Sequence, residues 1–502
     1  MALKHKIFLN VIAFSVTILL IAPAALTFPG NTLNISIDCD DTDGNIEPFS
    51  EINSGPLPIY YVNGADITPS YRSVGINFVR THDFYGPTDM STIFPDRNAD
   101  PSKEESYNFS SSDYYINGIV DAGCQVFYRL GESASDNNSL RQPPENFSKW
   151  AEICRHVVMH YNDGWDNGYH YNITYWEIWN EPDLGGFWNG TAEQYYEMYE
   201  KTSRTLKEYN SSLKIGGPCT SSIGNANYTT GFLDYVAEHG LPLDFFSWHM
   251  YADSPNELYG ASRAVRKMLD DHGFTECENI NTEWNINILS PQRDKDNAKN
   301  AAFTASSLIL FQDTGIDHAF RYRGTQNNDW LMRLLGFDLS LFAADGTFKR
   351  PALSYLAMHY LARDTPIRLS TPTNVSAGIT CLAGISGDKT NISILISNYD
   401  GPDTECDIAV GNLPWHSYRA VHYLIDEKHH LEVVEDNEMD SSAYNTTELI
   451  GKNSVHFIRL TNSTSIPDEG PEVASIPLLL RLPFLDPIFR IMGVIFLSMI
   501  FG

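Results

Sequence analysis

The stretch "TYWEIWNEPDLGGFW", residues 174–188, decides the fold. A short run rich in aromatic residues stops at Asn180 and Glu181, and a proline follows at once. Short apolar runs bounded by turn residues are typical of buried strands in a parallel sheet. In parallel α/β folds the working side chains lie at the carboxyl ends of the strands. The stretch therefore predicts a strand with a functional site at its end.

Similar runs recur between residues 46 and 365, separated by amphipathic stretches such as "PENFSKWAEICRHVVMHYN" (144–162) and "TAEQYYEMYEKTSRTLKEYN" (191–210). The other expected strands are "EINSGPLPIY" (51–60), "GINFVRTHDF" (75–84), "CQVFYRLG" (124–131), "LKIGGP" (213–218), "DFFSWHMY" (244–251), "NINTEWNI" (279–286) and "HAFRYRG" (318–324). Eight such units predict an α/β fold of the (β/α)₈ TIM barrel type. A doubly wound open sheet is the alternative, but no glycine-rich nucleotide loop follows any of these strands.

The regions outside the barrel have other textures. Residues 1–28 carry lysines followed by an apolar run, which predicts a signal peptide or an N-terminal anchor. Residues 29–45 are polar and turn-rich, so we expect a linker there. Residues 366–464 alternate like strands and predict a smaller C-terminal antiparallel β-sandwich. The tail, 465–502, is proline-rich and then apolar, and could attach the protein to a membrane or cell envelope.

Composition restricts the partners and the compartment. The formal net charge of -29 argues against nucleic acid, since phosphate binding needs clustered Lys and Arg. Twelve N-x-[ST] sequons and the N-terminal segment predict an exported glycoprotein, extracellular or at the cell surface. Seven cysteines lack zinc-site spacing, and Cys381 with Cys406 is the disulfide we would name. His156 and His160 have an i, i+4 spacing, but on an outer helix, so we expect no metal site.

The residues at the ends of the expected strands form a consistent polar set. They are Arg80, His82, Asn180, Glu181, His249, Tyr251, Glu283, Arg321 and Arg323. Glu181 and Glu283 end the fourth and seventh strands, so both can face one barrel mouth. Two carboxylates flanking a glycosidic bond are the machinery of glycoside hydrolysis. A gap of about 5 Å supports retention of configuration, and one of roughly 6.5–9.5 Å supports inversion.

These residues carry a resemblance to family 39 of the glycoside hydrolases. "EIWNEPDLGGFW", followed about a hundred residues later by "NTEWNI", is similar to that family in order and spacing, as are "FVRTHDFYG" and "DFFSWHMYAD". The resemblance implies a retaining barrel enzyme without cofactor or metal, in which Glu181 is the general acid/base and Glu283 the nucleophile. It also implies that Asn180 binds the sugar 2-hydroxyl. β-Xylosidase-like action is the first expectation, and α-L-iduronidase-like action the second.

The remaining candidates concern the sugar. Arg80, His82, His249 and Tyr251 could orient the nucleophile and the substrate hydroxyls, and Trp284 could give the sugar ring an apolar face. Arg321 and Arg323 could bind the carboxylate of a uronic acid. They could equally pair with Asp317, Asp329 or Glu132. The non-enzymatic alternative is a cell-surface carbohydrate-binding barrel that has lost turnover. The partner is in each case an oligosaccharide, a polysaccharide or a glycoside.

Overall fold

The computed structural model describes residues 32–56, 66–82, 86–133, 138–325, 336–376 and 378–463. The expected signal peptide at 1–28 and the tail at 465–502 lie outside these residues. Within the described part of the chain, none of the helices combines the length and the apolar character that crossing a membrane requires.

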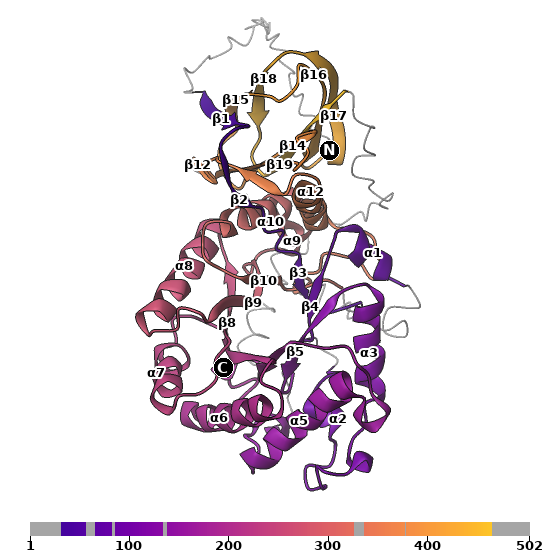
Figure 1. Ribbon diagram of the computed structural model, residues 1–502, viewed down its shortest axis with the longest axis vertical. Coiled ribbons are helices and arrows are strands. Elements are labelled where there is room, and N and C mark those ends of the chain that lie inside the picture. Colours follow the sequence, from indigo (N-terminus) through magenta and orange to yellow (C-terminus); the bar gives the residue numbers. More distant parts are fainter. Residues whose placement is uncertain are drawn as a thin grey trace, which may run out of the picture.

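Eight parallel strands close into a barrel in chain order (Figure 1). They are β3 (Glu51–Asn53), β4 (Phe78–Arg80), β5 (Gln125–Leu130), β6 (Tyr175–Ile178), β7 (Lys214–Thr220), β8 (Phe245–Ala252), β9 (Glu278–Ile286) and β10 (His318–Arg321). Strand β10 pairs with β3 and β9, which closes the ring. The predicted TIM barrel is thereby confirmed. The predicted smaller domain of mainly antiparallel strands is present as well.

Helices surround the barrel. They are α1 (Thr68–Ser73), α2 (Met90–Ile93), α3 (Ser110–Asp121), α4 (Asn138–Arg141), α5 (Phe147–Asp163), α6 (Ala192–Tyr209), α7 (Thr230–His239), α8 (Pro255–Asp271), α9 (Gln292–Asp296), α10 (Ala298–Phe311) and α12 (Arg350–Asp364). Local sequence sets the ends of the long ones. Thr191 and Gln194 form a capping box at the start of α6, and Gly164 ends α5 in a left-handed conformation with φ 76°.

The barrel interior changes from apolar to polar along the strands. Its lower layer is a buried cluster of six side chains: Phe78, Phe127, Tyr175, Phe245, Ile280 and Phe320. Side chains on a strand alternate between its two faces, so the residue two positions further on also points inward. On β4, β5 and β6 that residue is Arg80, Arg129 and Glu177, all fully buried. The barrel therefore has an aromatic floor beneath a charged layer at the carboxyl ends of the strands.

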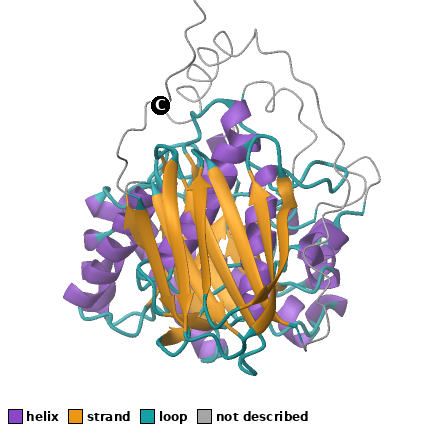
Figure 2. Cartoon of the chain, turned by 90° about the horizontal axis from the view of Figure 1, so that it is seen from above, coloured by secondary structure: helices purple, strands orange, loops and turns teal. Residues whose placement is uncertain are grey.

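A two-sheet sandwich packs against one side of the barrel, over α10 and α12 (Figure 1). The larger sheet contains β2 (Thr42–Asn45), β11 (Ile367–Leu369), β13 (Ile379–Ile385), β14 (Asn391–Asn398), β16 (Ser417–Ile425), β17 (His430–Asp440) and β19 (Ser454–Asn462), with β12 (Asn374–Ser376) paired to β13. The smaller contains β1 (Leu33–Asp38), β15 (Thr404–Gly411) and β18 (Tyr444–Ile450). Figure 2 shows the strands side by side, with helices beyond both flanks.

The segment expected to be a linker belongs to this sandwich. Strand β1 pairs in parallel with β15, with Leu33 opposite Cys406, and β2 pairs with β11, with Asn45 opposite Ile367, so the paired segments lie at opposite ends of the described chain. Ile35 and Ile37 point inward and are buried in the sandwich core. The prediction of a linker at 29–45 was wrong because the two isoleucines alternate with polar residues. That alternation is the signal of a strand with one buried face.

The predicted disulfide between Cys381 and Cys406 is also absent. All seven cysteines are buried with free thiols, and these two lie in the same apolar core of the sandwich. Burial raises the pKa of the Cys381 thiol to about 12, so it behaves as a small apolar side chain.

Candidate active site

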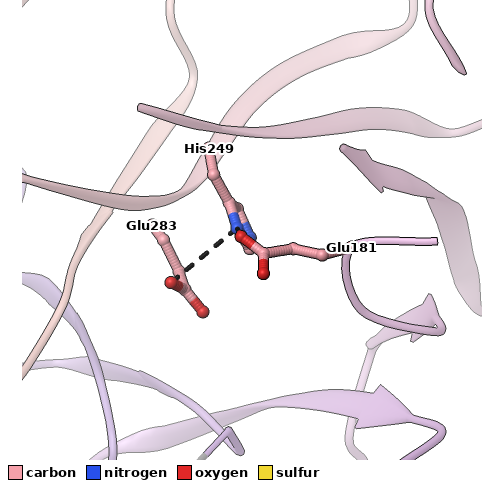
Figure 3. Close-up of side chains that lie close together, drawn as sticks. All are labelled: Glu181, His249 and Glu283. Atoms are coloured by element: carbon pink, nitrogen blue, oxygen red, sulfur yellow. Dashed lines mark hydrogen bonds and ion pairs between the residues drawn. The ribbon is translucent and has the colours of Figure 1, made fainter. Parts of the chain in front are cut away.

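Glu181 and Glu283 face each other across the barrel mouth, with His249 between them (Figure 3). One ligand atom from each of the three side chains lies within 4.8 Å of the other two. Nδ1 of His249 is 2.8 Å from Oε1 of Glu181 and 3.7 Å from Oε2 of Glu283. The three residues come from the ends of β6, β8 and β9, which only barrel closure brings together.

The backbone after β6 aims Glu181 at the mouth. The amide of Trp179 donates to the carbonyl of Leu130 at the end of β5, and the amide of Glu181 donates to the carbonyl of Cys219 near the end of β7. Glu181 has φ 42° and Trp179 has φ 78°, a left-handed region that non-glycine residues seldom occupy. Strained backbone of this kind is concentrated at functional sites, where the surrounding structure enforces it.

Glu283 is held by cationic and neutral donors. Nη1 of Arg80 is 2.9 Å from its Oε1, and the hydroxyl of Tyr251 donates to its Oε2 at 2.6 Å. Nε2 of His82 lies 3.8 Å from Oε1. An irregularity in the pairing of β8 with β9 puts His249 directly opposite Glu283. Partners directly opposite each other share one face of a sheet, so both side chains point into the mouth.

The two carboxyl groups have different electrostatic environments. Burial, and then the negative charge of Asp183, raises the pKa of Glu181 to about 8, against a smaller opposing effect of Arg80. Burial also raises the pKa of Glu283, but the charges of His249 and Arg80 and the Tyr251 hydroxyl counteract it. Near neutral pH, Glu181 therefore holds a proton while Glu283 has the partners that stabilise an anion.

Arg80 organises the charged layer beneath the mouth. Its guanidinium binds Glu177 through Nε at 2.7 Å, the Oδ1 of Asn53 at 2.9 Å and the Oδ1 of Asn180 at 2.7 Å, in addition to Glu283. A buried cation that is paired and hydrogen-bonded on several sides is fixed in position. Glu177 and Asn53 were not predicted as site residues. The inward alternation from Tyr175 to Glu177 was the available signal.

Two buried polar nitrogen atoms at the mouth have no hydrogen-bond partner among the described residues. Because the Oδ1 of Asn180 accepts from Arg80, its Nδ2 amide is free to donate, and no group bonds it. Nδ1 of His82 is likewise unpartnered. Burial, and then the charges of Arg129 and Arg80, lowers the pKa of His82, so its ring is neutral. Unsatisfied polar atoms at a mouth are available to the hydroxyls of a ligand.

Cys219 is a further residue at the site that the sequence did not single out. Its Sγ lies 3.1 Å from Nε2 of His249 and 3.0 Å from Nη2 of Arg80. The thiol therefore contacts the ring nitrogen of His249 that does not contact Glu181. Burial raises its pKa well above the ordinary value, so it stays protonated and can serve as a hydrogen-bond partner rather than a nucleophile.

Two of the predicted sugar-binding residues point away from the mouth. The ring of Trp284 lies beside Phe303 and Phe311 of α10, and its Nε1 donates to the carbonyl of Ala319. Arg321 pairs in register with Trp284 and is fully buried, with Nη2 donating to Asn285. Both predictions were wrong for one reason. Glu283 and Phe320 point inward, so the residue following each of them points toward the helices.

Arg323 lies nearer to the mouth than Arg321. Its charge helps to lower the pKa of His82, and its guanidinium lies 5.7 Å from the ring centre of Tyr322. The side chain is 3% exposed. Of the two arginines predicted to recognise a carboxylate, only this one borders the site.

Two groups of described side chains near the barrel have a spacing that could suit a metal ion. Glu181, His249 and Glu283 have a suitable spacing, but Glu181 holds a proton and Arg80 already pairs with Glu283, and both features oppose a cation. On α5, the Nε2 of His160 bonds Asp113 at 2.9 Å, and the Nδ1 of His156 bonds the carbonyl of Glu152. These two histidines make structural contacts in separate directions.

The comparisons with known proteins agree with this geometry. A model of the glycosyl hydrolases family 39 matches residues 64–327, more than half of the chain. The chain is 25% identical over 268 residues to a β-xylosidase of Geobacillus stearothermophilus, and 28% identical over 267 residues to one of Caldicellulosiruptor saccharolyticus. Each match covers 47% of this chain and 52% or 51% of the relative, so the chain spans about half the length of these curated relatives.

A solved structure extends the likeness to the sandwich. The glucosidase from Croceicoccus marinus superimposes with a TM-score of 0.75 at 26% identity, covering 86% of this chain and all of that one. The family match includes the strands that supply Glu181, His249 and Glu283. The chain therefore belongs to family 39 of the glycosyl hydrolases.

Proposed function

We propose that the protein is a retaining glycoside hydrolase in which Glu181 is the general acid/base and Glu283 the nucleophile. The observation that carries the proposal is the spacing of the two glutamates, which have carboxylate oxygens within 4.8 Å of each other at one mouth. Retaining enzymes have carboxyl groups about 5–5.5 Å apart, and inverting enzymes need a wider gap for a water molecule.

The reaction proceeds in two displacements. Glu283 attacks the anomeric carbon while Glu181 donates its proton to the departing glycosidic oxygen, which leaves a glycosyl ester on Glu283. Glu181, now ionised, takes a proton from a water molecule, whose oxygen attacks the same carbon and releases Glu283. The raised pKa of Glu181 supports the first role, because the group must hold a proton near neutral pH.

The neighbouring side chains support this assignment of roles. Arg80 and Tyr251 each bond one oxygen of Glu283, which favours its ionised form and orients it for attack. The free amide donor of Asn180 is suited to the sugar 2-hydroxyl, whose hydrogen bonds strengthen in the transition state. His249 contacts Glu181 and can keep that carboxyl aligned in both of its protonation states.

We infer a β-xyloside as the first substrate. The names of the curated relatives support this choice. The placement of Arg321 behind the strand also supports it, because this leaves the site without the pair of arginines that would grip a uronic acid. Arg323, which borders the mouth, favours an α-L-iduronide as the second candidate.

The test is a panel of aryl glycosides, namely xyloside, arabinoside, glucoside and iduronide. We expect the xyloside to be turned over fastest. The product should show net retention of configuration at the anomeric carbon, which NMR detects. Glu283→Ala should lose turnover. Glu181→Ala should cleave an activated aryl xyloside slowly, and azide should restore the rate and yield a glycosyl azide of retained configuration.

Three results would change the conclusion. An inverted product would remove the covalent intermediate and the role of Glu283. Faster cleavage of the iduronide than of the xyloside would transfer the assignment to a uronidase. Binding of these sugars without cleavage of any of them would identify a carbohydrate-binding barrel that has lost turnover.

We further propose that the protein is exported and glycosylated. Of the twelve sequon asparagines, eleven lie in the described residues; nine of these are exposed and two, Asn391 and Asn462, are half-buried. An N-linked oligosaccharide is bulky, so the folded protein can carry it only where the asparagine side chain reaches the surface. The test is a mass measurement of the protein from its native host before and after deglycosylation. An unchanged mass with the residue 1–28 segment intact would contradict export.

A further inference from the structure

A second group of histidine and carboxylate side chains lies in the sandwich, remote from the barrel mouth. His422 of β16, Glu435 of β17 and Glu448 of β18 each place one ligand atom within 4.8 Å of the other two. His422 lies directly opposite Glu435, so both side chains share one face of the larger sheet. Glu448 reaches them from the smaller sheet. The three residues therefore bridge the two layers of the sandwich.

A chain of hydrogen bonds fixes the proton on His422. The hydroxyl of Ser454 donates to the carbonyl of Gly451 at 2.7 Å, so its oxygen accepts from Nε2 of His456 at 3.0 Å. The Nδ1 of His456 then carries a lone pair, which accepts from Nε2 of His422 at 2.9 Å. A neutral His422 with its proton on Nε2 has a bare lone pair on Nδ1.

That lone pair points at the two carboxylates. Among the residues that the structure describes, Nδ1 of His422 has no hydrogen-bond partner, and the residue is only 4% exposed. The Oε2 of Glu448 lies 3.7 Å away, too far for a hydrogen bond that would share a proton. A buried lone pair facing carboxylate oxygens is repulsive unless a cation lies between them.

The spacing fits a metal ion. Imidazole nitrogen and carboxylate oxygen bind Zn²⁺ at about 2.0–2.2 Å, so two ligands of one ion are separated by up to ~4 Å. Ligating histidines commonly donate their other ring N–H to an acceptor that fixes the ring, which is the role of His456 here. The other oxygen of Glu448 accepts from Thr446 Oγ1 at 2.8 Å. Glu435 is exposed, so its side chain can move the short distance that brings its carboxylate into contact with an ion bound by His422 and Glu448.

We propose that His422, Glu435 and Glu448 bind one divalent transition-metal ion of the Zn²⁺ type, which fastens the β17 edge of the larger sheet to the smaller sheet. With three protein ligands, the fourth position belongs to water. Strand β17 is exposed along most of its length, so a bond from Glu435 across to β18 would hold this edge in place. The site stands apart from the proposed hydrolysis and does not depend on it.

The experiment is calorimetric titration of Zn²⁺ into the full chain after removal of bound metal with EDTA. Wild type should bind one equivalent, and its Tm should rise by about 2–4 °C. Glu435→Gln should weaken binding at least about tenfold and abolish the rise in Tm. Because Glu435 is exposed, this variant should have the wild-type Tm without metal. Glu432→Gln, an exposed acid on the same strand, is the matched control and should bind like wild type.

The active-site group is the competing location for the ion. Glu283→Gln is therefore titrated in parallel, and it should retain the full equivalent of Zn²⁺. Replacement of Zn²⁺ by Co²⁺ should give visible absorption bands that disappear in His422→Gln. Equal binding by wild type and Glu435→Gln would overturn the proposal. So would loss of binding in Glu283→Gln alone, or no binding of Zn²⁺ by wild type.

Discussion

Replacing Tyr251 by phenylalanine tests how the nucleophile is kept ionised. The Tyr251 hydroxyl donates to Oε2 of Glu283 at 2.6 Å, and both groups are largely buried. A donor stabilises a carboxylate more than a neutral carboxyl, so its removal raises the pKa of Glu283. Attack on the anomeric carbon needs the ionised form. We therefore expect the acidic limb of kcat/KM to move to higher pH in Tyr251→Phe.

The magnitude follows from the kind of hydrogen bond. Hydrogen bonds to charged groups contribute about 1.5–3 kcal/mol, and one pKa unit corresponds to about 1.36 kcal/mol. The acidic limb should therefore rise by about 1–2 pH units. At pH values below the acidic limb, kcat/KM of Tyr251→Phe should be about 10- to 100-fold lower than that of wild type. The basic limb, which depends on Glu181, should stay in place.

The assay is the pH profile of kcat/KM for an aryl β-xyloside. Tyr128→Phe is the matched control, because it removes a buried tyrosine hydroxyl on β5 that bonds no other group in the described part of the chain. Its profile should coincide with that of wild type. An unchanged acidic limb in Tyr251→Phe, or a shift of the basic limb alone, would refute the assignment of Glu283 as the ionised nucleophile.

Four other outcomes are expected. The wild-type kcat/KM should fall as pH rises through about 8, where Glu181 loses its proton, and Asp183→Asn should move this limb to lower pH because a charge that raises the pKa is removed. An unperturbed glutamate has a pKa of 4.5, whereas the pKa of Glu181 in the folded chain is about 8. Between these pH values the unfolded chain releases the proton and the folded chain keeps it, so the stability that Glu181 contributes at low pH is lost across this window. Glu181→Gln should therefore increase the free energy of unfolding at pH 8 relative to wild type, measured with denaturant. Arg321→Met should leave KM for the xyloside unchanged and be neutral or stabilising by about 1–4 kcal/mol, because it replaces a buried guanidinium whose Nε and Nη1 have no partner among the described residues. A tenfold rise in KM would place Arg321 at the substrate. Ile37→Ala should lower the free energy of unfolding by about 2–5 kcal/mol, whereas a linker residue would tolerate the change, and denaturant titration distinguishes the two.

The pattern of the sequence was sufficient for the barrel and for the two glutamates. Strand periodicity, proline and glycine boundaries, and carboxylates at strand ends are local features, and all of them are visible in "TYWEIWNEPDLGGFW" and "NINTEWNI". Arg80, His82, Asn180, His249 and Tyr251 could be named for the same reason. Strict side-chain alternation from the inward-pointing Phe320 would also have removed Arg321 from the set of mouth residues. It would not have removed Trp284, because the irregularity in the pairing of β9 that turns Glu283 inward is visible only in the structure.

Pairings between distant segments needed the folded chain. Strand β1 has the alternation of a half-buried strand, but its partner β15 lies far along the sequence, and so short a strand has no stable local form without that partner. The disulfide prediction used compartment and count, which do not report which sulfur atoms can approach each other.

By itself the sequence determined the class of fold, the family and the residues able to carry the chemistry, because strand periodicity and turn residues act over a few neighbouring positions. Only the tertiary structure decided that Glu177, Asn53 and Cys219 surround Arg80 and His249, and that His422 meets Glu435 and Glu448 across two sheets. Proton positions and charge at these sites depend on distances between segments tens to hundreds of residues apart. Those distances exist only once the barrel has closed and the sheets have packed.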